Sequence, residues 1–171
     1  VAEAEALYRT LPEFAAVSPS TGSGHLDRHR PAAGLRLPEG SWGANGDFSM
    51  WLGEQTAWTW ERLWPLERAF WEVAPAALEN PDAHPVLAQA TRELVLAQSS
   101  DWQFIISTGA VTDYAFRRFN GHCEHAERLV AALQPGLESG LAAARALAEE
   151  IRLQDDLFPD PLPAVAAALA G

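Results

Sequence analysis

The chain has 171 residues, 48% of them hydrophobic and 20% charged, which predicts one domain with a sizeable core. Its net charge of -11 and scattered basic residues exclude nucleic-acid binding, because a phosphate backbone requires clustered cations. Apolar runs are too short to span a membrane, and no secretory signal is visible. The single cysteine, Cys123, excludes an internal disulfide and favours a reducing, cytoplasmic location.

The N-terminal part, residues 1–47, combines a short helical pattern with a long irregular stretch. Apolar side chains at helical spacing predict a helix over 3–15, although Pro12 weakens its end. The Ser, Gly and Pro residues of 18–24 predict a loop, and residues 17–47 as a whole lack periodicity. A loop of this length within a compact domain is usually functional or disordered.

From residue 48 onward, apolar residues recur at helical spacing. Asp47 is expected to cap a helix over 49–78, in which Pro65 predicts a kink or break near Arg62. Further helices are expected between turn or cap residues: 86–98 after Pro85, 102–107 before Gly109, one from Thr112 to Pro135, and 137–153.

The helix after Thr112 has the clearest apolar stripe. Its members are spaced by three and four residues, as on one face of a helix packed against a core: Phe116, Phe119, Cys123, Ala126, Val130 and Leu133. The proline-rich tail that follows residue 155 is expected to lie across the surface, with a frayed turn near Val165.

These elements predict an all-α fold, a bundle of about five helices with one long loop that bears glycine and tryptophan. No alternating strand pattern lasts more than a few residues. We expect a single domain over 1–171, with the N-terminal helix and loop at 1–47, the bundle at 48–155 and the tail at 156–171.

The most distinctive segment is the loop GSWGANGDFSMW at 40–51. Glycines allow sharp turns and close approach of a ligand, and tryptophans offer broad apolar faces. Flat apolar faces among Ser, Asn and Asp suit a sugar, which has C–H faces and a rim of hydroxyls. Trp42 and Trp51 flank the polar residues and are candidates for ligand contact, whereas we expect Trp58, Trp64 and Trp71 in the core.

Carboxyl groups near this loop could form a glycosidic catalytic pair, which needs two such groups facing one bond. The candidates are Glu39, Asp47, Glu54 and Asp101. Asp47 and Asp101 precede helices and are explained as caps, and Glu54 as a solvated helix charge. No nucleophile elbow, phosphate-binding loop or dinucleotide fingerprint is present, so no cofactor is predicted.

His122 and His125 share a helix face, which raises the question of a metal site. Cys123 lies on the apolar stripe, rotated away from both, and the sequence offers no third ligand. We therefore predict no metal site and a histidine pair solvated on a polar helix face.

Several segments together resemble the C-terminal helical region of glycoside hydrolase family 57 α-glucan branching enzymes. They are LPEGSWG at 37–43, WLGEQTAWTW at 51–60, AQSSDWQF at 97–104, TG at 108–109, YAFRRF at 114–119 followed by His122, and DLFP at 156–159. The resemblance covers about residues 3–160. Gly53, where the family usually has Asn, and Pro65 within a helix are departures from its pattern.

The resemblance implies that the catalytic Glu and Asp lie in a (β/α)₇ barrel upstream in the same polypeptide, and that this chain begins after them. It implies an α-glucan as substrate, with Trp42 and Trp51 lining its path. Asp101 and Trp102, in the family's Q-S-S-D-W segment, are carried over as weaker substrate-site residues. No catalytic residue, metal or cofactor is carried over to this chain.

The expected function is thus the substrate-binding helical domain of a retaining 1,4-α-glucan branching enzyme of glycogen synthesis. One alternative within the family is a 4-α-glucanotransferase or amylase. Others are a non-catalytic glucan-binding module, or a helical domain whose tryptophans contact a protein partner.

Overall fold

The computed structural model describes residues 9–10, 19–43, 46–136 and 140–171. Its described part is all-α, as predicted, and contains no strand. The chain forms two units, residues 1–39 and 40–171, and the second of them holds the hydrophobic core. No helix in the described ranges is long and apolar enough to cross a membrane.

In the first unit, α2 (Gly22–Arg28) occupies part of the stretch predicted to be a loop. The Thr21 Oγ1 atom caps it by accepting a hydrogen bond from the Gly24 amide at 3.1 Å. This cap offsets the low helix propensity of the glycines, which is why composition misled the prediction. The helix predicted over 3–15 lies outside the described residues except for Arg9 and Thr10.

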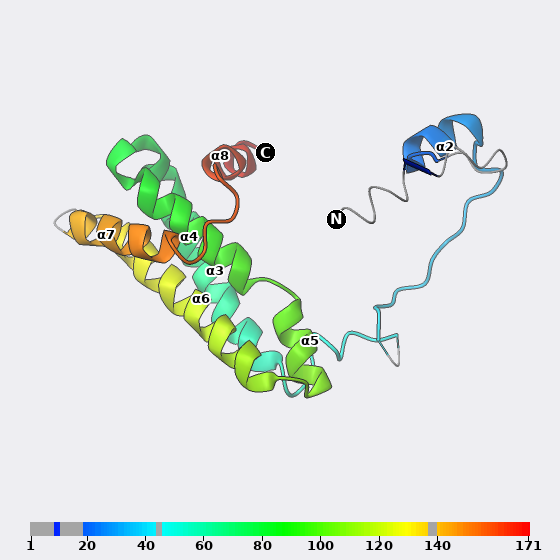
Figure 1. The fold of residues 1–171 in the computed structure, drawn as a ribbon, viewed down its shortest axis with the longest axis horizontal. Helices are drawn as coiled ribbons and strands as arrows, with labels where there is room; N and C mark the ends of the chain where they lie inside the picture. The colour runs from blue at the N-terminus through cyan, green and yellow to red at the C-terminus, as the bar shows by residue number, and fades with distance from the viewer. Residues whose placement is uncertain (1–8, 11–18, 44–45, 137–139) are drawn as a thin grey trace. The chain divides into compact units, whose positions relative to one another are not determined.

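Antiparallel helices make up the body of the second unit (Figure 1). Its elements are α3 (Ala57–Glu79), η2 (Pro81–Ala83), α4 (His84–Ala97), α5 (Asp101–Thr108), α6 (Thr112–Ala132), α7 (Leu141–Arg152) and α8 (Leu162–Ala170). α4 packs against α3, α6, α7 and α8, which makes it the central helix. α5 lies beside α6, at the end of the bundle where α3 and α6 begin (Figure 1).

The core fills the space between these helices. Its largest fully buried apolar side chains are Leu63, Phe70, Leu87, Phe119, Leu129 and Ile151. The stripe predicted on α6 is confirmed for four members, while Phe116 is 40% exposed and stacks on Trp58, with ring centroids 5.5 Å apart.

Two predicted helix ends are confirmed. Gly109 ends α5 in the left-handed conformation (φ 71°), and Pro85 lies in the first turn of α4.

α3 begins later than predicted, at Ala57 instead of residue 49. The Asp47 carboxylate does accept a hydrogen bond from the Ser49 amide, at 3.0 Å, but it caps a turn. Further turns follow, closed by backbone bonds from Leu52 to Phe48 and from Thr56 to Gly53. Asp47 therefore stabilises the loop and leaves the start of the helix to later residues.

The break that Pro65 predicts near Arg62 does not occur, because α3 runs without interruption through both Pro65 and Pro75. A kink there stays a prediction. Both prolines are exposed. The carbonyls that they leave without an intrahelical donor belong to Glu61, which is exposed, and Trp71, which is half-buried. Water near these residues limits the penalty of the missing bonds.

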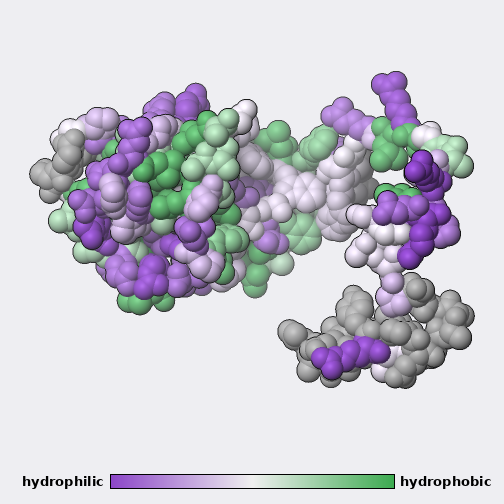
Figure 2. Space-filling view, turned by 90° about the horizontal axis from the view of Figure 1, so that it is seen from above, coloured by the Kyte–Doolittle hydropathy of each residue, from purple (hydrophilic) through white to green (hydrophobic). Residues whose placement is uncertain are grey.

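The expected core positions of the tryptophans hold only in part. Trp58 and Trp71 are half-buried against the core, but Trp64 is 54% exposed. Its neighbour Leu63 faces the core, and a step of one residue turns a side chain by about 100° around a helix. Figure 2 shows hydrophobic and hydrophilic residues interspersed over one face of the molecule.

The tail differs from prediction because it contains the regular helix α8 in place of a frayed turn. Val165 is 3% exposed and lines a small cavity with Phe70 of α3 and Leu94 of α4. Burial of one apolar residue against two helices explains why this short segment is ordered as a helix.

The reactivity of the Cys123 thiol reports how well the core excludes solvent. Burial raises the pKa of its thiol to about 12, from an ordinary value of 9.0. We expect thiol reagents at pH 8 to label the chain only in step with unfolding, as followed by circular dichroism in denaturant.

The raised pKa of this thiol also makes stability depend on pH. Above pH 9 the unfolded thiol ionises while the folded thiol stays protonated. Stability should therefore fall by up to about 1.4 kcal/mol per pH unit.

The control is Cys123→Ala, which should lose this part of the pH dependence. Rapid labelling of the native chain at pH 8 would contradict the closed core.

Candidate functional site

Aromatic side chains meet where the loop before α3 contacts α5. Trp42 is 68% exposed, and its ring lies 6.3 Å from the ring of half-buried Trp51 in an edge-on arrangement. The Trp42 ring also lies 5.5 Å from the ring of Phe104 of α5. The structure thus brings together the two tryptophans singled out from the sequence, and it adds Phe104 to them.

Hydrogen bonds to the backbone fix the position of this loop. The Trp51 carbonyl accepts two, from Thr56 Oγ1 at 2.9 Å and from the Trp60 indole Nε1 at 2.7 Å. The Ser107 hydroxyl of α5 donates to the Met50 carbonyl. Because Thr56 is fully buried, its bond is shielded from competing water, and the loop is tied to both α3 and α5.

α5 is itself joined to α3 through a buried bond between side chains. Gln103 Nε2 donates to Thr59 Oγ1 at 3.0 Å, and both residues are about 1% exposed or less. Phe104 and Ser107 lie three residues apart and so share one face of α5, the face that meets the loop. α5 therefore acts as the support for the aromatic surface.

Of the two remaining predicted site residues, Trp102 turns toward the core, whereas Asp101 precedes Phe104 by three residues and shares its side of α5. Trp102 is only 8% exposed, and its indole donates to the Leu96 carbonyl at 2.7 Å. Asp101 is exposed in the first turn of α5, where its carboxylate accepts a bond from Ser99 Oγ at 3.0 Å. Substrate contact by either stays a prediction, and the burial of Trp102 favours a packing role.

Sequence reasoning missed Phe104, Ser107 and Trp60. The signal for Phe104 was the segment AQSSDWQF at 97–104, from which only the Asp and Trp are taken as site residues, and Trp60 ends the segment WLGEQTAWTW at 51–60. Helical spacing from Asp101 reaches Phe104 at the third residue and would have found one of them.

A polar hollow of about 340 Å³ lies beside the loop. Its lining includes Asp47, Ser49, Glu54, Gln55 and Ser107. Two of the four carboxylates weighed from the sequence thus line one hollow, while Asp101 does not and Glu39 belongs to the other unit. Acceptors and donors next to exposed aromatic rings are the combination that a polyhydroxylated ligand requires.

A second polar cluster lies within the bundle and was not predicted. His122 is 2% exposed, so its expected position on a solvated face was wrong. Its Nδ1 atom lies 2.8 Å from Glu93 Oε2 on α4 and 3.9 Å from Asp155 Oδ2. Its neighbour on the same face, His125, approaches the same Glu93 oxygen at 3.4 Å. The partners were hidden because they come from distant parts of the sequence.

This cluster is the group of described residues best placed to share an ion. Glu93, His122 and Asp155 offer ligand atoms within 4.8 Å of one another. Their distances, however, are those of direct contacts, and Gln89 and Arg118 already donate to Glu93 and Asp155 at 2.9 and 3.0 Å. The arrangement is explained as a buried polar network whose carboxylates are held by direct contacts, while the His122 Nε2 atom has no hydrogen-bond partner among the described residues.

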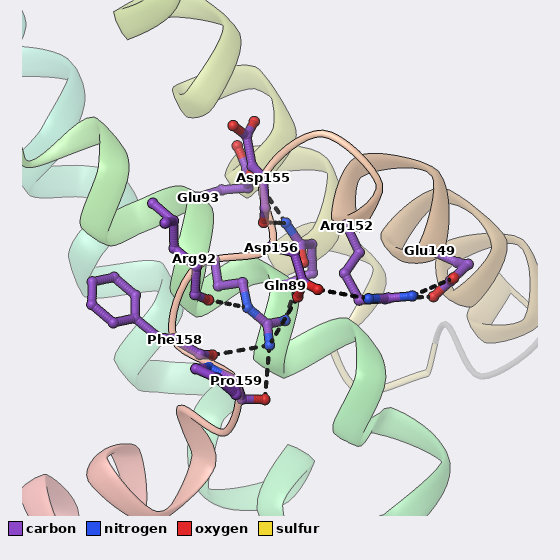
Figure 3. Close-up of polar contacts among 10 residues, drawn as sticks. Gln89, Arg92, Glu93, Glu149, Arg152, Asp155, Asp156, Phe158 and Pro159 are labelled. Atoms are coloured by element: carbon purple, nitrogen blue, oxygen red, sulfur yellow. Dashed lines mark hydrogen bonds and ion pairs between the residues drawn. The ribbon is translucent and has the colours of Figure 1, made fainter. Parts of the chain in front are cut away.

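Arg92 extends this network to the tail, as Figure 3 shows. The side chain is almost fully buried, and its guanidinium donates to the carbonyls of Leu157 at 2.6 Å, Phe158 at 3.0 Å and Pro159 at 3.1 Å. Phe158 has a φ of 54°, which non-glycine residues rarely adopt. Arg92 therefore holds the closing DLFP segment in a conformation that it would not favour alone.

Gly53 is required by the geometry of the loop. A Cβ atom there would lie 2.5 Å from the Ser49 carbonyl oxygen, which is backbone and cannot move aside cheaply. We expect Gly53→Ala to lower the free energy of unfolding by about 1–3 kcal/mol. Its matched control is Gly121→Ala in the middle of α6, where a Cβ meets nothing and should stabilise by about 0.5–1 kcal/mol.

Denaturant unfolding of both variants checks this prediction. Equal effects of the two substitutions would contradict a strained approach at Gly53.

Arg92 should contribute strongly to stability. Arg92→Met leaves three carbonyls of the tail without their donor, and we expect a loss of about 2–4 kcal/mol in the free energy of unfolding. Amide hydrogen exchange in α8 should be faster in Arg92→Met than in the wild type. Arg145→Met is the control, because the ion pair of Arg145 with Asp82 is exposed and should contribute less than about 1 kcal/mol. Unchanged exchange in α8 would show that the tail does not depend on Arg92.

Known proteins are similar to this chain in sequence and in structure. The family model described as "1,4-alpha-glucan branching enzyme, C-terminal" matches residues 65–161. The chain is 36% identical over 125 residues to the 1,4-alpha-glucan branching enzyme of Thermococcus kodakarensis, covering 72% of this chain and 18% of that protein. A probable 1,4-alpha-glucan branching enzyme of Mycobacterium tuberculosis is 31% identical over 132 residues, covering 72% and 24%.

Solved structures agree with the sequences. A GH57-type branching enzyme from Pyrococcus horikoshii matches with a TM-score of 0.75 and 33% identity, over 86% of this chain and 28% of that one. The Thermococcus kodakaraensis GH57 branching enzyme, solved with glucose and additives, matches with a TM-score of 0.67 and 33% identity, over 84% and 26%. The chain spans less than a third of each of these proteins. It belongs to the family of C-terminal domains of GH57 1,4-alpha-glucan branching enzymes.

Proposed function

We propose that this domain holds an α-glucan against the aromatic surface of Trp42 and Trp51 while a catalytic domain of the same polypeptide acts on it. The observation that carries the proposal is the exposed Trp42 ring, set between Trp51 and Phe104. A large aromatic ring with this exposure, on a loop fixed by hydrogen bonds to α3 and α5, is typical of a binding surface.

The ligand class follows from the chemistry around these rings. A glucan presents C–H faces that pack on indole rings and hydroxyls that need donors and acceptors. The hollow beside the loop supplies the latter through Asp47, Ser49 and Gln55. A net charge of -11 disfavours phosphorylated ligands and leaves a neutral polysaccharide as the better match. The names of the relatives and the glucose in one of their structures support the same class.

In the proposed reaction an α-1,4 bond is cleaved and the chain is transferred to a 6-hydroxyl with retention, by double displacement. The nucleophile and the acid/base belong to the catalytic domain, and no residue of this chain is assigned to either role. The contribution of this domain is to position the glucan and to exclude water from the cleft. Exclusion of water favours a sugar hydroxyl as the acceptor over hydrolysis. Glycogen synthesis in the cytoplasm is part of the proposal.

Substitution of the two tryptophans in the full polypeptide tests this function. We expect Trp42→Ala and Trp51→Ala each to raise KM for amylose at least about fivefold, through loss of roughly 1 kcal/mol of stacking. The assay is the formation of new α-1,6 branches. Trp42→Phe is the matched control, because it keeps a flat aromatic face and should retain most of the affinity.

Unfolding temperature should hardly change in Trp42→Ala, since the ring is mostly exposed. Wild-type branching kinetics and oligosaccharide affinity in both alanine variants would rule out this surface as the glucan site. Products with only α-1,4 links from the wild-type enzyme would rule out branching.

A further inference from the structure

The aromatic surface continues beyond Trp51 along α3. The Trp60 indole donates to the Trp51 carbonyl, which fixes Trp60 next to the loop. The ring of Trp64 lies 6.1 Å from that of Trp60, with an angle of 34° between them. A run of contacts thus leads from Trp42 through Trp51 and Trp60 to Trp64.

Trp64 is exposed in a way that packing does not explain. Its exposed fraction is 54%, while its helical neighbours Leu63 and Leu66 are almost fully buried. α3 therefore presents an indole ring to solvent on a face separate from its core stripe. Large apolar side chains that gather at a surface mark a binding site more often than single ones do.

Charged residues surround this ring. Glu61, Glu67 and Arg68 stand three residues before, three after and four after Trp64, so they share its side of the helix. Glu61 and Arg68 are exposed and Glu67 is half-buried. An apolar face with carboxylate and guanidinium groups at its rim offers both parts of sugar recognition, stacking and hydrogen bonds to hydroxyls.

We propose that Trp64, supported by Trp60, is a further subsite for the α-glucan chain, beyond the one formed by Trp42 and Trp51. This inference rests on the function proposed above. Trp64 lies four positions after Trp60, about 6 Å further along the helix axis, and Trp60 is the residue that contacts Trp51. A subsite displaced in this way contacts a glucan only when the chain is long enough to extend past the first one.

The subsite therefore governs chain-length dependence. Affinity should increase between short and long maltooligosaccharides, and Trp64 should contribute to that increase without affecting the short ones. A uniform effect on all lengths is the signature of a different role, the packing of Trp64 against the rest of the polypeptide.

The experiment measures calorimetric dissociation constants of the full polypeptide for maltotriose, maltoheptaose and a longer amylose fraction. Trp64→Ala should bind maltotriose like the wild type and the longest glucan at least about fivefold more weakly. Trp64→Phe should keep most of the gain with length. Trp42→Ala should weaken binding of every length.

The outcomes separate the two ideas. If Trp42→Ala binds every length as the wild type does, the proposed function fails. If Trp42→Ala weakens binding but Trp64→Ala keeps the full gain with length, only the subsite fails. Equal weakening of all lengths by Trp64→Ala, or a lower unfolding temperature of the full polypeptide, would assign Trp64 to packing and overturn the subsite.

Discussion

The architecture depends on a carboxylate that has no access to solvent. Glu93 is fully buried on α4, the helix that contacts α3, α6, α7 and α8. A buried charge without partners would be strongly destabilising, so α6 must bring His122 to it, while Gln89 of α4 itself donates to it from one turn earlier. The same face of α4 presents Arg92 to the tail. One polar face of a central helix thus fixes α6 and the segment that leads into α8.

This network and the aromatic surface lie on opposite sides of one short helix. Trp102 of α5 turns inward, with its ring 6.1 Å from that of His122. Phe104 and Ser107 of the same helix turn toward the loop that carries Trp42 and Trp51. The position of the loop is therefore set by an element whose inner face is held by the core, which favours a surface formed before a ligand arrives.

Sequence periodicity was a good guide wherever contacts are local. The α6 stripe depends on spacing within one helix, and the left-handed Gly109 ends α5 because of its own backbone freedom. The errors involve distant partners. The order of α8 depends on Val165 meeting α3 and α4, and the burial of His122 on Glu93, 29 residues away. No short window of sequence contains either contact.

In the candidate site, too, features set by local sequence were predicted and those set by distant contacts were not. The composition of the loop at 40–51 marked Trp42 and Trp51 as unusual, because glycines and polar residues flank them. Which neighbours complete the surface depends on how α5 and α3 pack: helical spacing from Asp101 reaches Phe104, but nothing in the sequence places Trp60 beside the loop. Trp64 was misplaced because stripes of large residues on a helix usually face a core, and a rotation of one residue reverses that assignment.

The two hydrogen bonds that the Trp51 carbonyl accepts have a consequence for ligand selectivity. Because the indole N–H of Trp60 is engaged by that carbonyl, Trp60 offers a ligand only its hydrocarbon faces. A ring without a free donor cannot distinguish one hydroxyl from the next, so it does not define a register along a repeating polymer. Under the proposed function, Trp60 therefore adds stacking to a bound glucan without fixing the position of any one glucose unit.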